Sequence, residues 1–352
     1  MILLVIVGLE SWNVSQYALT PGEAKPVAPL VHVSGLATNS HPDTIFLTDV
    51  YLQSLTAWQW LTLHLQSHVT FVNANQLIEP GLATDELSAQ GFLDMFDSKQ
   101  AAQVAALRAL GWPVHATPMG AVINGVVVPS PARQMGLHVA DRIVGANGVK
   151  ITSACDLIYL VHDVAIGQSL RLKVERAKIS TKGLITWGPP QTKILVTSRP
   201  PATIANSGCS GVQGPSKSWI GVSLEDAIHY MLPGSISIDT NYIGGPSAGL
   251  AMTLALLDVL SKGSLTGHVP VAATGTIDVH GMIGDVGGVA QKTVAVERAG
   301  AKIFFVPKVE VPEASAQATP ELRIIGVSTL AEVLRDLRAL GGDPLVARTP
   351  PH

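Results

Sequence analysis

The stretch IGGPSAGLAM, Ile243 to Met252, places one serine between glycines at the start of an apolar segment. We predict a strand just before it, over 234–239, and a buried helix after it, because the residues up to Leu260 are apolar on nearly every helical face. Pro246 suits the first turn of that helix. Ser247 is therefore predicted at a helix N-terminus, where free N–H groups and the positive dipole end stabilise an oxyanion.

Two other interpretations of Ser247 remain open at this point. Serine at a helix start most often serves only as an N-cap. GPSAG also fits G-x-S-x-G, the nucleophile turn of α/β-hydrolases, and an esterase of that kind would need a histidine base such as His280. The repeated strand–helix units of that fold are missing from the chain, which disfavours the esterase.

A lysine offers a better general base. In DVGGVAQKTVAVERAGA we predict a helix that begins near Gly287 or Gly288, with Lys292 on the same apolar stripe as Val289 and Val296. Burial and the positive end of the helix dipole both favour a neutral amine and lower its pKa. A neutral amine can take the proton of a serine hydroxyl. The alternative is that the lysine stem packs and its charged end reaches water.

Three motifs in order, GGPSAG, ATGTIDVHGMIGDVGGVAQK and AGAKIFFVPK, closely resemble the Lon-type proteolytic domain. The resemblance implies a Ser-Lys dyad with Ser247 as nucleophile and Lys292, 45 positions later (292 − 247), as general base. It also implies that the Thr274 hydroxyl orients the amine. Gly244 and Gly245 would let a substrate backbone come close. Many ATP-dependent members carry an aspartate three residues before the serine, where this chain has Gly244.

A second segment has a strand, short helix, strand pattern, over about 120–176. Ser130-Pro131 predicts a helix start and Asn147-Gly148 a hairpin turn. The sequence SPARQMGLHVADRIVGANG, followed by a helix in SACDLIYLVHDV and a strand in SLRLKVERA, resembles a PDZ domain. The resemblance implies capture of extended C-terminal peptides by strand addition. The usual carboxylate-binding loop is not recognisable, and a small β-rich domain without a ligand remains the alternative.

The first hundred residues contain mixed helical and strand-like segments. We predict a strand pair over 43–52, a packed helix over 54–66, and an amphipathic helix over 97–111 with Asp97 as its N-cap. The apolar start, MILLVIVGLE, is too short to span a bilayer. It predicts either a buried strand or the last part of a membrane anchor.

Composition excludes several classes of partner and cofactor. The 352 residues carry a net charge of −3 and no dense basic block, so no nucleic-acid partner is expected. The phosphate-loop spacing G-x-x-x-x-G-K-[ST] is absent, so no nucleotide site is expected. Cys155 and Cys209 lack metal-ligand spacing; no metal or other cofactor is expected. A disulfide between these cysteines is left open but not expected across more than 50 residues.

The chain is thus predicted to be an α+β multidomain protein that resembles the YlbL-like family of bacterial membrane-anchored proteases. That resemblance implies an ATP-independent serine endopeptidase for membrane-associated or secreted proteins, with one N-terminal anchor and an extracytoplasmic catalytic domain. It leaves a homo-oligomer open, and the competing class is an inactive PDZ scaffold or chaperone. The predicted parts are an apolar segment (1–10), an N-terminal α/β region (11–112), a PDZ-like domain (113–200), a linker (201–217) and a Lon-type proteolytic domain (218–345).

Overall fold

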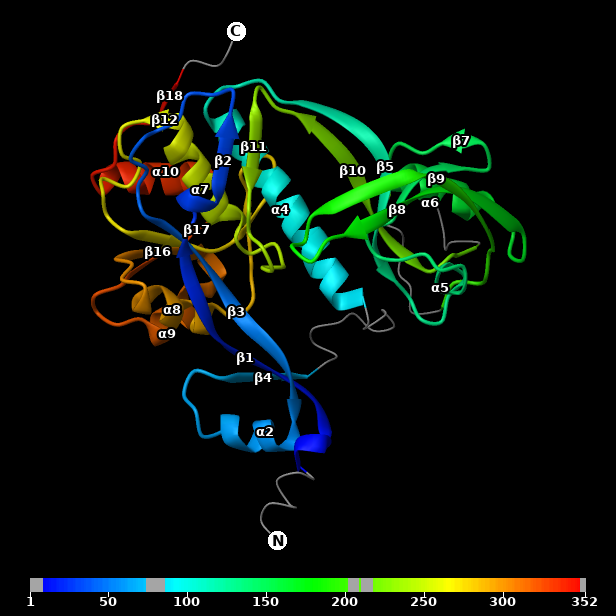
Figure 1. Ribbon diagram of the computed structural model, residues 1–352, viewed down its shortest axis with the longest axis horizontal. Coiled ribbons are helices and arrows are strands. Elements are labelled where there is room, and N and C mark those ends of the chain that lie inside the picture. Colours follow the sequence, from blue (N-terminus) through cyan, green and yellow to red (C-terminus); the bar gives the residue numbers. More distant parts are fainter. Residues whose placement is uncertain (1–8, 74–85, 202–208, 210–217, 349–352) are drawn as a thin grey trace.

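Two six-stranded sheets organise the protein, and the long helix α4 (Leu87–Ala109) runs between them (Figure 1). The computed structural model describes residues 9–73, 86–201, 209 and 218–348. The apolar segment 1–8 and nearly all of the predicted linker lie outside the described residues. Among the helices of the described part, none is long and apolar enough to cross a membrane.

The first sheet combines strands from both ends of the chain in the order β17-β16-β13-β3-β1-β4. The early strands pair antiparallel, whereas β3, β13, β16 and β17 are parallel neighbours. The strands are β1 (Asn13–Pro26), β3 (Ile45–Thr56), β4 (Thr70–Asn73), β13 (Val271–Ala273), β16 (Ile303–Pro307) and β17 (Arg323–Val327).

Helices cover both faces of this sheet, because alternate residues of each strand point to opposite sides. In β16, Ile303 and Phe305 face one core with α4, α7 and α10, whereas Phe304 and Val306 face the other with α8 and α9. All twelve residues of α7 are buried, as predicted from its apolar sequence. These helices are α7 (Gly249–Leu260), α8 (Val289–Arg298), α9 (Val311–Gln317) and α10 (Leu330–Ala339).

Short elements connect the layers of this half. The predicted strand over 234–239 is present as β11 and pairs with β2. The short elements are β2 (Val31–Ser34), β11 (Ser235–Ile238), β12 (Ser261–Lys262), β14 (Thr276–Ile277), β15 (Ile283–Gly284), β18 (Val346–Ala347), α2 (Ala57–Leu63), and the 3-10 turns Ala28–Leu30 and Lys308–Glu310.

The second sheet has the order β10-β5-β6-β8-β9, with β7 paired to β6. Ser130 caps α5 by accepting the Arg133 N–H, and Asn147 and Gly148 adopt φ of 49° and 86° in the predicted turn. Both local predictions are confirmed. The elements are β5 (His115–Val126), β6 (Arg142–Ala146), β7 (Val149–Lys150), β8 (Ser169–Ile179), β9 (Ile185–Val196), β10 (Val222–Met231), α5 (Pro131–Gln134) and α6 (Ala154–Asp163).

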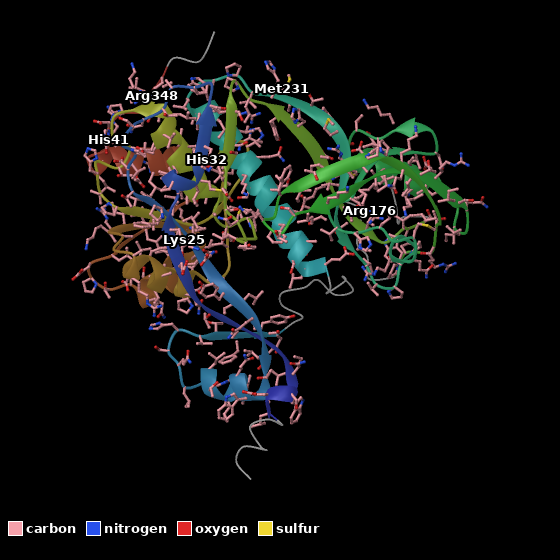
Figure 2. All side chains as sticks on the ribbon, viewed as in Figure 1. Lys25, His32, His41, Arg176, Met231 and Arg348 are labelled. Atoms are coloured by element: carbon pink, nitrogen blue, oxygen red, sulfur yellow. A yellow bond between two sulfur atoms is a disulfide. The ribbon has the colours of Figure 1, made fainter. Side chains whose placement is uncertain are left out.

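The two sheets do not follow the boundaries predicted at residues 112 and 218. Strands β1 and β3, from the predicted N-terminal region, complete the sheet that carries β13. Strand β10, from the predicted proteolytic segment, instead pairs with β5 and ends at Met231, near the connection to β11 (Figure 2). Local hydrophobic periodicity cannot predict pairing between strands that lie so far apart in the sequence.

Three local predictions in the first hundred residues need correction. The strand pair over 43–52 is one continuous strand, β3, and the helix over 54–66 is the shorter α2. Helix α4 begins at Leu87 rather than after Asp97, so Asp97 is not its N-cap. The apolar face of α4 continues toward its N-terminus through Leu93 and Phe96, which pack on the second sheet.

The expectation for the cysteines is also corrected, because Cys155 and Cys209 form a disulfide with a Cα–Cα distance of 5.7 Å. Cys155 lies at the start of α6, and the chain beyond β9 returns to it. Sequence separation alone could not exclude this contact, since the fold brings the two segments together.

Removal of this disulfide is expected to lower the free energy of unfolding by about 4 kcal/mol, because a bond that closes a loop of 54 positions restricts the unfolded chain. Urea unfolding of the oxidised protein and of a Cys155→Ala, Cys209→Ala double variant measures the difference. A reducing agent should destabilise the wild type and leave the double variant unchanged. Equal stability of both proteins would contradict the prediction.

Candidate active site

Ser247 lies in the loop that joins β11 to α7. Gly245 has φ +86°, and Ala248 is the N-cap of α7, so Pro246 and Ser247 precede the helix rather than forming its first turn. The Ser247 carbonyl accepts hydrogen bonds from the Gly275 N–H at 3.0 Å and the Thr274 hydroxyl at 3.2 Å. These two hydrogen bonds fix the serine backbone to the segment that follows β13. The serine itself is half-buried.

Lys292 occupies the first turns of α8, which begins after Gly288 as predicted. Its side chain is 2% exposed, and burial lowers the pKa of the Lys292 amine to about 8. The carboxylates of Glu310, Asp49 and Glu313 act in the opposite direction. At neutral pH a useful fraction of this amine is therefore neutral, which a general base requires.

Thr274 connects the two halves of the site. Lys292 Nζ donates to Thr274 Oγ1 at 3.3 Å, and the same hydroxyl donates to the Ser247 carbonyl. Thr274 is fully buried. Over the described ranges, no hydrogen bond joins the Ser247 hydroxyl directly to Lys292. The hydroxyl of Thr274 therefore links the lysine amine to the backbone of Ser247.

Gly245 and Gly244 lie beside helix α4. The Gly245 N–H donates to the Gly91 carbonyl of α4 at 2.7 Å, so it is not free to bind an oxyanion in this arrangement. A Cβ atom added to Gly244 would lie 3.2 Å from the Gly91 carbonyl carbon and oxygen. Gly244 therefore packs tightly against α4, and a side chain at this position would require a small shift of the Gly91 backbone.

Several residues near the site had no clear sequence signal. Glu310 is 8% exposed, accepts the Val286 N–H at 2.6 Å, and burial raises the pKa of its carboxyl group. Asp49 comes from β3, and Ser98 from α4 donates to the Pro246 carbonyl at 3.0 Å. The predicted helix began at Asp97, so it included Ser98 but gave no reason to place it beside the serine loop.

An acidic cavity of about 270 Å³ adjoins the serine loop at Pro246. Asp94 and Asp97 of α4 and Glu225 of β10 line it. Burial, with Glu225 nearby, raises the pKa of Asp94 to about 6 and that of Asp97 to about 7. Asp97, predicted as a helix N-cap, instead lies in the wall of this cavity.

His280, the base that an esterase would require, is exposed in the turn between β14 and β15. The backbone N–H of His280 donates to Asp278 Oδ1 at 2.8 Å. No hydrogen bond between His280 and Ser247 occurs in the described portion of the chain, which favours the lysine as base.

Comparison with protein families matches both halves of the chain. Residues 225–339 match the Lon protease (S16) C-terminal proteolytic domain, and residues 95–182 match the PDZ domain. The second match includes the C-terminal part of α4.

Relatives are similar to the proteolytic segment alone. Lon protease 2 of Bacillus subtilis is 36% identical over 110 residues, which are 31% of this chain and 18% of that protein. Lon protease of Chloroflexus aggregans is 35% identical over 115 residues, 32% of this chain and 13% of the relative. The chain thus spans less than a fifth of the length of these curated relatives.

The motifs, the mixed helix and strand architecture and the family matches agree with one another. Ser247, Thr274 and Lys292 all lie within the segment that matches the proteolytic domain. The chain therefore joins a PDZ domain to a proteolytic domain of the Lon (S16) serine peptidase family.

Proposed function

We propose that the chain is an ATP-independent serine endopeptidase in which Ser247 is the nucleophile and Lys292 the general base. The observation that carries this proposal is the buried amine of Lys292, which contacts Thr274 and through it the Ser247 loop. Among the described residues no carboxylate forms an ion pair with Lys292 at hydrogen-bond distance; burial of such a lysine is costly, and a catalytic role accounts for it.

The chemistry follows from the protonation states. Neutral Lys292 takes the Ser247 hydroxyl proton while the oxygen attacks the peptide carbonyl, and the resulting ammonium then protonates the leaving amine. The acyl-enzyme is hydrolysed by water that Lys292 deprotonates in turn. The Ser247 side chain turns toward Nζ when substrate binds, as catalytic hydrogen bonds often form only in the complex.

The oxyanion is stabilised by backbone N–H groups at the start of α7, those of Ser247 and Ala248. They stand at the positive end of a buried helix, where negative charge is favoured. Gly245 is not assigned to this role because its N–H already binds Gly91.

The PDZ domain captures the substrate or regulates its access. Strand β10 is the terminal strand of the second sheet and lies beside α6, with the Ala154 N–H bound to Asp226 Oδ1 at 2.7 Å. A C-terminal peptide would add to the sheet as a further strand beside β10. Strand β10 continues along the chain into β11 and then into the serine loop. Protein or peptide substrates are therefore proposed, and a homo-oligomer remains part of the family-based expectation.

We place the catalytic domain outside the cytoplasmic membrane, held at its surface by an N-terminal anchor, with membrane-associated or secreted proteins as substrates. The disulfide supports an oxidising location, because such bonds are rare in the cytosol. The apolar residues at the start of the sequence support the anchor.

The test compares the protein termini of cells that carry the wild type or Ser247→Ala at equal abundance. New termini on cell-surface or secreted proteins that disappear in the variant are expected, and they would identify substrates. Identical termini in both strains would overturn the proposal and favour an inactive scaffold.

A further inference from the structure

Helix α4 makes two hydrogen bonds to the loop that carries Ser247. The Gly91 carbonyl accepts the Gly245 N–H at 2.7 Å, and Ser98 Oγ donates to the Pro246 carbonyl at 3.0 Å. Gly91 and Ser98 are about two helical turns apart and hence lie on one face of α4. Two consecutive residues before the nucleophile are thus fixed by one helix from outside the Lon-type segment.

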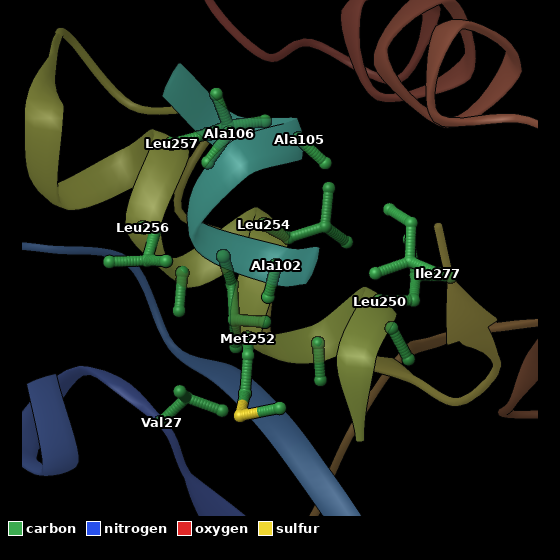
Figure 3. Packing of buried hydrophobic residues seen from close by; sticks show 14 of the residues in the cluster. Val27, Ala102, Ala105, Ala106, Leu250, Met252, Leu254, Leu256, Leu257 and Ile277 are labelled. Carbon is green, nitrogen blue, oxygen red and sulfur yellow. The ribbon is translucent and has the colours of Figure 1, made fainter. Parts of the chain in front are cut away.

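The contact is close enough to require small residues. A Cβ atom on Gly244 would lie 3.2 Å from the Gly91 carbonyl, and one on Gly249 would lie 3.0 Å from Ser98 Oγ. Ser98 is 5% exposed, so water does not compete for its hydroxyl. Further along the same helix, Ala102, Ala105 and Ala106 pack against Leu254 and Leu257 of α7 (Figure 3).

Another face of α4 rests on the second sheet. Leu93 is buried against Val122 and Ile185, and the Phe96 ring meets Trp187 edge-on with 5.5 Å between centroids. The helix therefore has the PDZ sheet on one side and the serine loop on the other. In Figure 1 it spans the space between the two halves of the molecule.

We propose that α4 is a positioning element of the active site, in which the Gly91 carbonyl and the Ser98 hydroxyl hold the serine loop so that Ser247 faces Thr274 and Lys292. Because α4 also packs against the second sheet, which carries the PDZ domain, the position of the serine loop depends on that sheet. The proposal rests on the proposed peptidase function. It assigns no chemical step to α4, since neither residue touches the reacting atoms.

The test measures kcat and KM of the purified chain on a fluorogenic peptide, together with the rate at which a peptidyl phosphonate ester labels Ser247. Ser98→Ala is expected to lower kcat and the labelling rate about tenfold, the effect of one lost buried hydrogen bond, with KM nearly unchanged. The midpoint of the pH profile should not move, because Lys292 keeps its surroundings. Ser218→Ala is the matched control: this serine is 1% exposed, donates to the Val161 carbonyl at 2.7 Å, and should leave both rates at the wild-type value.

A second substitution tests the contact without removing a hydroxyl. Gly91→Leu favours the helix but projects carbons toward Gly244 and Gly245, whose atoms already lie 3.8 to 3.9 Å from an added Cβ. We expect about a hundredfold loss of labelling with unfolding temperature maintained. Wild-type rates in both Ser98→Ala and Gly91→Leu would overturn the positioning role.

The link to the PDZ sheet is tested by Phe96→Ala, which should lower the labelling rate severalfold. Phe71→Ala is the control and should leave the rate unchanged, because it removes a ring of β4 that stacks on His64, with 4.0 Å between centroids, in a hydrophobic cluster separate from that of Phe96. A wild-type rate in Phe96→Ala would overturn the link. Absence of labelling and hydrolysis in the wild type would instead overturn the proposed function, which separates the two failures.

Discussion

Replacement of Lys292 by methionine is expected to reduce kcat/KM by about 10³-fold or more, because Ser247 then has no base. Methionine fills the same buried volume without a charge. At pH 7, below the folded pKa of about 8, the wild-type amine is mostly protonated in a buried site. The variant should therefore be more stable than the wild type by about 3 kcal/mol at that pH, the free energy that corresponds to the lowering of the pKa from 10.5 to about 8.

Loss of activity with a gain in stability separates a catalytic lysine from one that supports the fold. Peptide hydrolysis and urea unfolding on the same preparations provide both numbers. Lys262→Met is the control: this lysine is exposed in β12, just after α7, and its substitution should change neither quantity. A Lys292→Met protein that keeps more than a tenth of the wild-type kcat/KM would contradict the assignment.

The pH–rate profile of the wild type should fall below pH 8, by about tenfold for each unit, so that activity at pH 6 is about a hundredth of its maximum. The cause is protonation of the buried amine. Glu310 and Asp49 favour the protonated form and oppose a still lower pKa. A profile that is flat from pH 6 to 9 would remove Lys292 from the role of base, provided that the acylation step is the one observed.

The same titration makes the free energy of unfolding depend on pH, in a direction that can be measured. The pKa of Lys292 is lowered on folding from 10.5 to about 8, so the unfolded chain binds more protons between these values. Stability should therefore rise with pH across that window, as far as this lysine contributes, and be independent of its titration below pH 8. Urea unfolding at pH 7.5 and 9.5, for the wild type and Lys292→Met, isolates the contribution.

The sequence was most informative where the chemistry is local. The apolar helix after Ser247 and the helix start at Gly288 are visible in short segments, and both are confirmed. The position of Thr274 came from the family resemblance, and the structure places its hydroxyl between lysine and serine loop. The assignment of these three residues to catalysis remains a prediction.

The parts that could not be predicted depend on contacts between distant segments. Lys292 is buried partly because β1 and β3, more than 200 residues earlier, join the sheet against which α8 packs. Helix α4 was predicted from residue 97 onward, and the missing N-terminal turns contain Gly91, which binds the serine loop. The hydrophobic periodicity of these segments does not indicate which distant segment each of them packs against.

The departure at Gly244 also has a physical explanation that sequence could not provide. An aspartate at this position would meet the Gly91 backbone, whereas glycine leaves room for the helix. Glycine at this position is thus consistent with the tight packing of the serine loop against α4, and by itself it does not indicate an inactive enzyme.

The central claim is that Ser247 is a nucleophile activated by Lys292. The most direct measurement is mass-spectrometric mapping of the residue that a peptidyl phosphonate ester modifies, at pH 8.5, in the wild type and in Lys292→Met. A single adduct on Ser247 that forms in the wild type and is nearly absent from the variant is the predicted result. An adduct on another residue, or equal labelling of Ser247 in both proteins, would contradict the account.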